Sequence, residues 1–263
     1  MKVKDIIAVL EEFAPLGIQE KWDNSGLIIG SPDNDVHGVM LGFDCTPELI
    51  DEAALAGCDM VVTHHPLIFK GMNHIDPFDY PVGAAVYKAV QAGIAVYAAH
   101  TTADKVIAGV SGAMARRLGL LDIEVLEPEE DGSVGLGAVG NLPVPMTAGE
   151  VLEMVKERFG LGVIRHSRPV EGLISRIAVL GGSGGGDIPA ARASGAQLYI
   201  TADISYHNFF TSGDFMLMDI GHFESEVEIV DILLALIRKK IPNFADCVRA
   251  CVNRNNPVHY FGI

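Results

Sequence analysis

Short apolar segments that alternate with helix-forming segments constrain the fold of this chain more than any other feature. Met60–Thr63 is one of them, an apolar run that ends in a threonine and is stopped by His64-His65-Pro66. Another run, 94–99, is followed at once by His100. Strands that alternate with helices are typical of proteins built around a parallel sheet. The sequence therefore predicts an α/β fold with mixed, largely parallel sheets.

The same pattern continues through both halves of the chain. We expect helices at 3–13, 46–57, 82–92, 106–118, 147–159 and 224–241, and strands at 27–30, 36–43, 60–63, 94–99, 134–139, 177–180, 197–201, 215–220 and 258–261. The segment 126–132 is rich in Glu, Asp and Pro and is the expected boundary. We therefore expect two similar α/β halves, 1–127 and 128–263, although no clean internal repeat is visible.

The charge balance argues against nucleic acid as a partner. The chain has 19 Lys and Arg against 34 Asp and Glu, a formal net charge of -15. A protein that grips nucleic acid through phosphates normally needs a basic face. The short runs Arg116-Arg117 and Arg238-Lys239-Lys240 suit helix C-termini instead.

No feature of the sequence places the chain in a membrane or in an oxidising compartment. It has no apolar run long enough to cross a bilayer, and its first residues lack the pattern of a signal peptide. We expect a cytoplasmic protein whose cysteines, Cys45, Cys58, Cys247 and Cys251, are reduced and buried rather than metal-bound.

Potential metal ligands follow three of the predicted strands. Ligands of open α/β sheets bind beyond the carboxyl ends of strands, and the three ends carry His64 and His65, His100 and Asp104, and His222 and Glu226. Imidazole and carboxylate together suit Zn, Mn, Fe, Ni or Co. Three histidines and two carboxylates are too many for one tetrahedral zinc and suit two ions. The predicted ligands are His64, His65, Asp104, His222 and Glu226.

Each of these groups also has a simpler interpretation. The histidine pair could be part of a polar loop, and Asp104 could be a helix N-cap. His222 and Glu226 are one helical turn apart and could be a surface pair. Their coincidence at three strand ends favours the metal interpretation.

Several other residues could support such a site. His100 is a possible further ligand, for which we favour an outer, orienting role. Asp44 and His207 are candidate helpers, His207 as a proton carrier. Ordinary turn and cap chemistry is the alternative for the group formed by Asp23, Asn24, Asp44, Thr46, Asp203 and His207.

The glycine-rich segment 181–187 follows a predicted strand and opens a helix. Such loops can bind phosphate through backbone N–H groups. It matches neither a P-loop nor a dinucleotide-binding fingerprint. A tight strand-to-helix turn is the alternative.

The order of these motifs resembles a known family. The motifs are Trp22-Asp23-Asn24-x-Gly26-Leu27, Asp44-x-Thr46, Thr63-His64-His65-Pro66-Leu67, His100-Thr101-x-x-Asp104 and Gly221-His222-x-x-Ser225-Glu226. Together they resemble the Nif-three-like family, which includes YbgI-like dinuclear metal proteins and whose members are often named type 2 homologues of GTP cyclohydrolase I. Ala103 and Ala202 depart from the family pattern, where a larger apolar residue and a glycine are more usual.

The resemblance implies more than the residues show by themselves. It implies two intertwined α/β halves with a dinuclear metal cleft between them, with Glu226 as the bridging ligand. It also implies a ring-shaped homohexamer built as a trimer of dimers. We expect a metal-dependent hydrolase that acts on a nucleotide-like or phosphate-containing small molecule. The alternative is a non-catalytic metal-binding or regulatory protein that forms rings.

Overall fold

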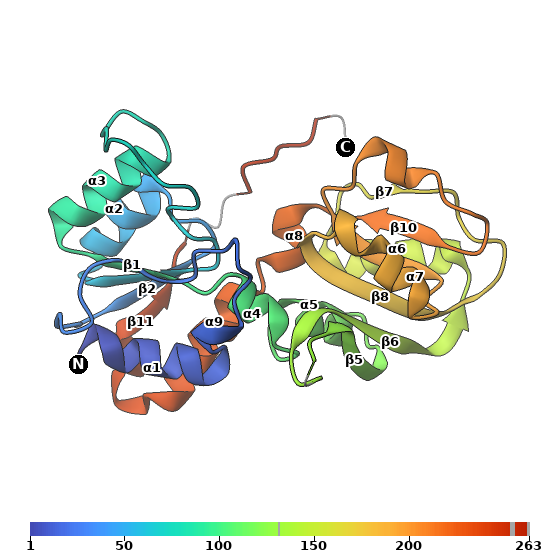
Figure 1. Cartoon of the computed structure of the whole chain (residues 1–263), viewed down its shortest axis with the longest axis horizontal. Coiled ribbons are helices and arrows are strands. Elements are labelled where there is room, and N and C mark those ends of the chain that lie inside the picture. Colours follow the sequence, from blue (N-terminus) through green and yellow to red (C-terminus); the bar gives the residue numbers. More distant parts are fainter. Residues whose placement is uncertain (131, 253–255, 262–263) are drawn as a thin grey trace. The chain divides into compact units, whose positions relative to one another are not determined.

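The computed structural model describes residues 1–130, 132–252 and 256–261 (Figure 1). The chain forms two compact units, Met1–Ala103 with Ile229–Asn255 and Asp104–Glu228 with Asn256–Ile263, in each case as far as the chain is described. Each unit is thus assembled from two separate stretches of the chain. The units do not coincide with the expected halves 1–127 and 128–263.

The first unit contains a five-stranded sheet in the order β1-β4-β3-β2-β11. Its strands are β1 (Gly26–Ile29), β2 (Val39–Gly42), β3 (Met60–Thr63), β4 (Ala95–Ala98) and β11 (Val248–Ala250). Only β1 runs antiparallel to its neighbour; the other pairings are parallel. The helices of this unit are α1 (Val3–Phe13), η1 (Leu16–Ile18), α2 (Pro47–Leu55), α3 (Val82–Ala92), α9 (Ile229–Lys240) and η4 (Pro242–Cys247).

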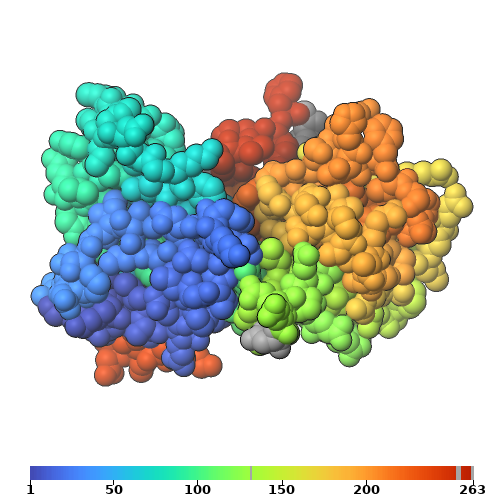
Figure 2. All heavy atoms as spheres, viewed as in Figure 1, coloured from blue at the N-terminus to red at the C-terminus, as the bar shows by residue number. Residues whose placement is uncertain are grey.

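Helices cover both faces of this sheet. Figure 1 shows α2 and α3 on one face and α1 and α9 on the other. Every residue of β2, β3 and β4 is buried, and Met40, Val61 and Val96 share a cluster with residues of α2 and α3. In the space-filling view, residues coloured blue to cyan form much of the visible surface of this unit (Figure 2). Burial on both faces explains why these strands are continuously apolar in sequence.

The second unit contains a six-stranded sheet in the order β5-β6-β8-β9-β10-β7. Here β8, β9 and β10 run parallel, whereas the remaining pairs are antiparallel. The strands are β5 (Leu121–Pro128), β6 (Gly135–Met146), β7 (Arg165–His166), β8 (Ile174–Ser183), β9 (Leu198–Ala202) and β10 (Met216–Asp219). The helices are α5 (Val110–Arg117), α6 (Ala148–Phe159), η2 (Gly185–Asp187), α7 (Ile188–Ala193), η3 (Tyr206–Phe209) and α8 (His222–Glu226). The chain enters the unit within α4 (Thr101–Lys105).

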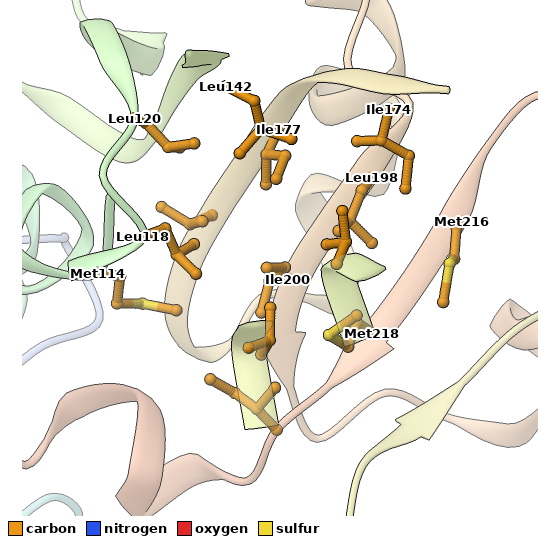
Figure 3. Close-up of a cluster of buried hydrophobic side chains, with 14 of the residues drawn as sticks. Met114, Leu118, Leu120, Leu142, Ile174, Ile177, Leu198, Ile200, Met216 and Met218 are labelled. Atoms are coloured by element: carbon orange, nitrogen blue, oxygen red, sulfur yellow. The ribbon is translucent and has the colours of Figure 1, made fainter. Parts of the chain in front are cut away.

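Alternate residues of the central strands face opposite sides of the second sheet. Ile177 and Leu198 belong to the cluster packed with α5 and α6, much of which Figure 3 shows. Ala178 and Tyr199, the next residue on each strand, belong to a second cluster that includes Ala191 of α7. Both faces are therefore covered, and the expected mixed α/β fold is confirmed in both units.

Several expected elements differ from the structure. The expected helix 224–241 is two helices, α8 and α9, separated where the chain returns to the first unit. The expected helix 106–118 is reduced to α5, with α4 preceding it. The expected boundary segment 126–132 falls between Leu121 and Met146, the outer limits of β5 and β6, which pair with each other within one compact unit.

The predicted strand 258–261 is wrong. Its residues form no strand, and Val258, Tyr260 and Phe261 are exposed. Strand β5 was not expected, because most of its residues are exposed and polar residues interrupt its apolar pattern. No helix among the described residues is long and apolar enough to cross a membrane.

Candidate metal centre

Three histidines meet at one edge of the first sheet. Strands β2, β3 and β4 are parallel, so their carboxyl ends lie at the same edge. His64 and His65 directly follow β3, and His100 comes two residues after β4. One ring nitrogen from each of these three histidines lies within 4.8 Å of the others. The structure thus brings together residues that the sequence places at two different strand ends.

Hydrogen bonds orient all three imidazole rings in the same way. In each ring Nδ1 donates to an oxygen atom, and the pairs are His64 to the Ala99 carbonyl at 2.9 Å, His65 to Asp44 Oδ1 at 2.7 Å and His100 to Asp23 Oδ1 at 2.7 Å. A proton held on Nδ1 leaves Nε2 as the nitrogen with a lone pair, the form in which imidazole binds metals. Each of the three rings therefore presents Nε2 as the nitrogen that is able to bind a metal.

Asp23 is held as a buried carboxylate. Its side chain is fully buried beside His100, and it also accepts hydrogen bonds from the Ser25 and Thr101 hydroxyls. Burial favours the neutral acid, but the hydrogen bonds from His100, Ser25 and Thr101 outweigh it and hold the pKa of Asp23 well below its ordinary value. Its position follows from the antiparallel pairing of β1 with β4, which sets Gly26 opposite Ala98.

Packing also restricts the histidine pair. The buried ring of Phe43 stacks on His64, with centroids 5.7 Å apart, and meets His65 edge-on at 4.7 Å. His64 itself is fully buried. A ligand that is already held by packing and by a hydrogen bond loses little freedom when it binds an ion.

The second unit presents a similar arrangement. Strands β9 and β10 are parallel, and their ends lead to Asp203 and His222. His222 Nδ1 donates to Asp203 Oδ2 at 2.7 Å, and its Nε2 lies 3.0 Å from Glu226 Oε2. Two ligand atoms that each lie about 2.1 Å from the same ion, with a right angle between their bonds to it, are roughly 3 Å apart. The distance between His222 Nε2 and Glu226 Oε2 therefore fits two ligands of one ion. Glu226 is only 4% exposed, which argues against an ordinary surface pair.

Asp203 is held in an unusual conformation while it orients His222. Its φ of 53° lies in the left-handed region, which few non-glycine residues adopt. Burial raises its pKa, but hydrogen bonds from His222 and from the Ser183 hydroxyl outweigh that effect and lower it overall. Asp203 therefore remains charged beside His222, as Asp23 does beside His100.

Three amides of the glycine-rich segment already have partners within the fold. The amides of Gly181, Gly182 and Gly184 donate to the hydroxyls of Ser111, Ser225 and Thr201. These amides are thus already engaged within the unit. Gly182 has a φ of 68°, and a Cβ there would collide with Glu226 Oε1. The turn interpretation is favoured, with the absence of a side chain at 182 making room for the Glu226 carboxylate.

The other residues singled out from the sequence differ in their local surroundings. Asp104 lies inside α4 and is half-buried, so it does not cap that helix. Thr46 is an ordinary cap, because its hydroxyl accepts from the Leu49 amide at the start of α2. His207 is exposed on η3, where its ring contacts Tyr206. Ala103 and Ala202 are fully buried.

From the sequence, an outer, orienting role was favoured for His100, with a further ligand as the alternative. The structure groups its ring with those of His64 and His65. The available signal was its position after β4, which repeats the position of the histidine pair after β3.

Comparison with known proteins covers both units. The family model of Duf34/NIF3 (NGG1p interacting factor 3) matches residues 1–257. A Clostridium acetobutylicum protein named GTP cyclohydrolase 1 type 2 homolog is 32% identical over 260 residues, 97% of each chain.

Solved structures agree with the family model. The crystal structure of a Bacillus cereus protein related to NIF3 has a TM-score of 0.90 at 22% identity and covers 100% of this chain and 99% of that chain. A Staphylococcus aureus hypothetical protein has a TM-score of 0.87 at 26% identity and covers 99% of both chains. The likeness extends over nearly the whole length, and this chain belongs to the Duf34/NIF3 family.

Proposed function

We propose that this chain binds two divalent metal ions and hydrolyses a small nucleotide-like or phosphate-containing molecule with them. The proposed ligands are His64, His65, Asp104, His222 and Glu226. Glu226 is proposed as the ligand shared by both ions. The orientation of the histidines supports this proposal most directly, because each ring donates from Nδ1 to a carboxylate or carbonyl oxygen.

The residues of this chain supply the surroundings for that chemistry. Bound divalent ions would act as Lewis acids that polarise a substrate oxygen and lower the pKa of water. Asp44, Asp23 and Asp203 hold the proton of their histidine on Nδ1, so each ring keeps one tautomer. The net charge of -15 disfavours long nucleic acids as substrates. The name of the Clostridium acetobutylicum relative points to nucleotide chemistry for that protein.

A non-catalytic metal-binding protein is the second candidate. One observation favours it. His207, the proposed proton carrier, is exposed and packs against Tyr206, and it belongs to none of the ligand groups among the described residues. Metal binding without turnover across nucleotide and phosphoester substrates would support this alternative.

The first prediction concerns metal content. We expect purified protein to carry about two divalent ions per chain, and His64→Ala and His222→Ala each to lose at least one, because too few ligands remain to hold both. Elemental analysis of the folded variants measures this. The exposed His74 offers a matched control, and His74→Ala should keep its full metal content. Full occupancy in both ligand variants would refute the assignment.

The second prediction concerns the glycine beside Glu226. Gly182→Ala should displace the Glu226 carboxylate and weaken metal binding by about 10–100-fold, as changes around ligands commonly do. Gly186→Ala in the same loop is the control, because a Cβ there meets no atom within 4 Å. Equal metal affinities of the two variants would show that Gly182 does not set the position of Glu226.

The third prediction concerns turnover. Hydrolysis, screened on phosphoesters and cyclohydrolase substrates with added Mn or Zn, should disappear with a chelator and return with the metal. Asp104→Asn should lower the rate by more than about 100-fold, whereas Asp44→Asn, which affects only the orientation of His65, should lower it by about 10–100-fold. Activity that survives complete metal removal would defeat the mechanism.

The fourth prediction concerns assembly. We propose a homohexamer, a trimer of dimers, on the basis of the family resemblance. Light scattering at micromolar concentration should give the mass of about six chains. A monomeric mass would contradict the proposal.

A further inference from the structure

Two large aromatic side chains are exposed next to His100. Trp22 is 59% exposed and Phe69 is 47% exposed, although rings of this size are usually buried. Their centroids are 5.9 Å apart, and they lie 6.0 and 6.1 Å from the His100 ring. Neither ring has a role in the proposed ligand set. They form an aromatic surface at the edge of the three-histidine group.

The two loops that carry these rings are joined to each other and to the site. Asn24 Nδ2 donates to the Ile68 carbonyl at 2.6 Å, which links the residues beside Trp22 and Phe69. Asp23, the residue after Trp22, is fixed by His100, Ser25 and Thr101. The spacing of the two rings therefore does not depend on flexible side chains alone. The planes of the two rings are tilted by 54°, so a flat base would stack on one ring and contact the other at its edge. Such a preformed pair binds a ligand with little cost in ordering.

One exposed lysine lies next to each ring in the sequence, in a chain that is acidic overall. Lys21 precedes Trp22 and Lys70 follows Phe69, and both lysines are exposed. Neither forms an ion pair with another residue in the described parts of the chain. Each aromatic ring is thus adjacent in sequence to an ammonium group that is available to an anionic ligand. Aromatic rings stack on flat bases, and lysines attract phosphate.

We propose that Trp22 and Phe69 form a stacking subsite for the base of a mononucleotide, with Lys21 and Lys70 attracting its phosphate. This inference rests on the proposed function and specifies its substrate class. A mononucleotide fits better than a nucleic acid strand, because the net charge of -15 repels a long polyanion. The subsite places the base beside His100 and accounts for aromatic residues that the metal ligands leave unexplained.

Trp22 provides a direct test because it is the single tryptophan of the chain. The full-length, metal-containing protein is titrated with guanosine 5′-monophosphate and, in parallel, with ribose 5-phosphate, which differs only in lacking the base. Fluorescence is corrected for absorption by the base with free tryptophan amide. We expect saturable quenching by the nucleotide and no comparable change with the sugar phosphate.

Variants test whether stacking on Trp22 and Phe69 is the cause of nucleotide binding. Phe69→Ala and Trp22→Ala should each weaken nucleotide binding about 5- to 150-fold, the effect expected for losing one stacking partner. Trp22→Phe should retain most of the affinity, measured by calorimetry because it lacks the fluorophore. Phe78→Ala is the matched control, since Phe78 is 91% exposed in the same unit and should not affect binding. All of these variants should keep the metal content of the parent.

The outcomes distinguish this inference from the proposed function. Quenching that is equal for nucleotide and sugar phosphate, or affinities unchanged in Phe69→Ala and Trp22→Ala, would overturn the subsite. No quenching in protein with its full metal content would overturn the subsite and leave the metal proposal standing. Base-dependent quenching in protein that carries no metal as purified and binds none when metal is added would support the subsite and contradict the metal proposal. An RNA oligonucleotide that binds more tightly than the mononucleotide would overturn the proposed occupant.

Discussion

The hydrogen bond from a histidine Nδ1 to a fixed oxygen is the interaction on which the candidate metal centre depends. It occurs at His64, His65, His100 and His222, with a backbone carbonyl as acceptor once and a carboxylate three times. Each such bond chooses the tautomer and directs Nε2 as a ligand. A polar loop would not require the same choice at four histidines in two separate units. Hydrogen bonds lower the pKa of two of these acceptors, Asp23 and Asp203, against the effect of burial and so maintain their charge.

Sheet topology brings the donors and acceptors together. In the first unit β2, β3 and β4 are parallel, so Asp44 and the histidines emerge at one edge. In the second unit the parallel pair β9 and β10 does the same for Asp203 and His222. The buried strands explain the apolar sequence runs, and the polar residues begin where the strands end. Fold and chemistry therefore share one cause, the arrangement of parallel strands between helices.

Local sequence patterns predicted the parts of this structure that local interactions determine. The buried strand Met60–Thr63 and the Thr46 helix cap were predicted from residue type and spacing. The expected helix 224–241 was too long, because its pattern does not show that the chain changes unit between α8 and α9. The strand at 258–261 was wrong, and its apolar residues Val258, Tyr260 and Phe261 are exposed, so burial does not support a strand there.

In the candidate site, too, local features were predicted from the sequence and contacts between distant residues were not. The ligand types and their strand-end positions were visible in sequence, and so was the ambiguity of the glycine-rich segment. Only the structure shows that the Gly182 amide is bonded to Ser225, or that Gly182 makes room for Glu226. Likewise, Trp22 and Phe69 are far apart in sequence, so their contact beside His100 could not be predicted from spacing.

The most direct measurement of the central claim is the position of the bound ions in crystals of the metal-loaded protein. Anomalous diffraction recorded at the absorption edge of the bound metal locates each ion independently of the protein atoms. The account predicts peaks within about 2.0–2.2 Å of Nε2 of His64, His65 and His222, with none at an Nδ1 atom. Peaks beside Nδ1, or ions bound only at surface carboxylates away from these histidines, would contradict it.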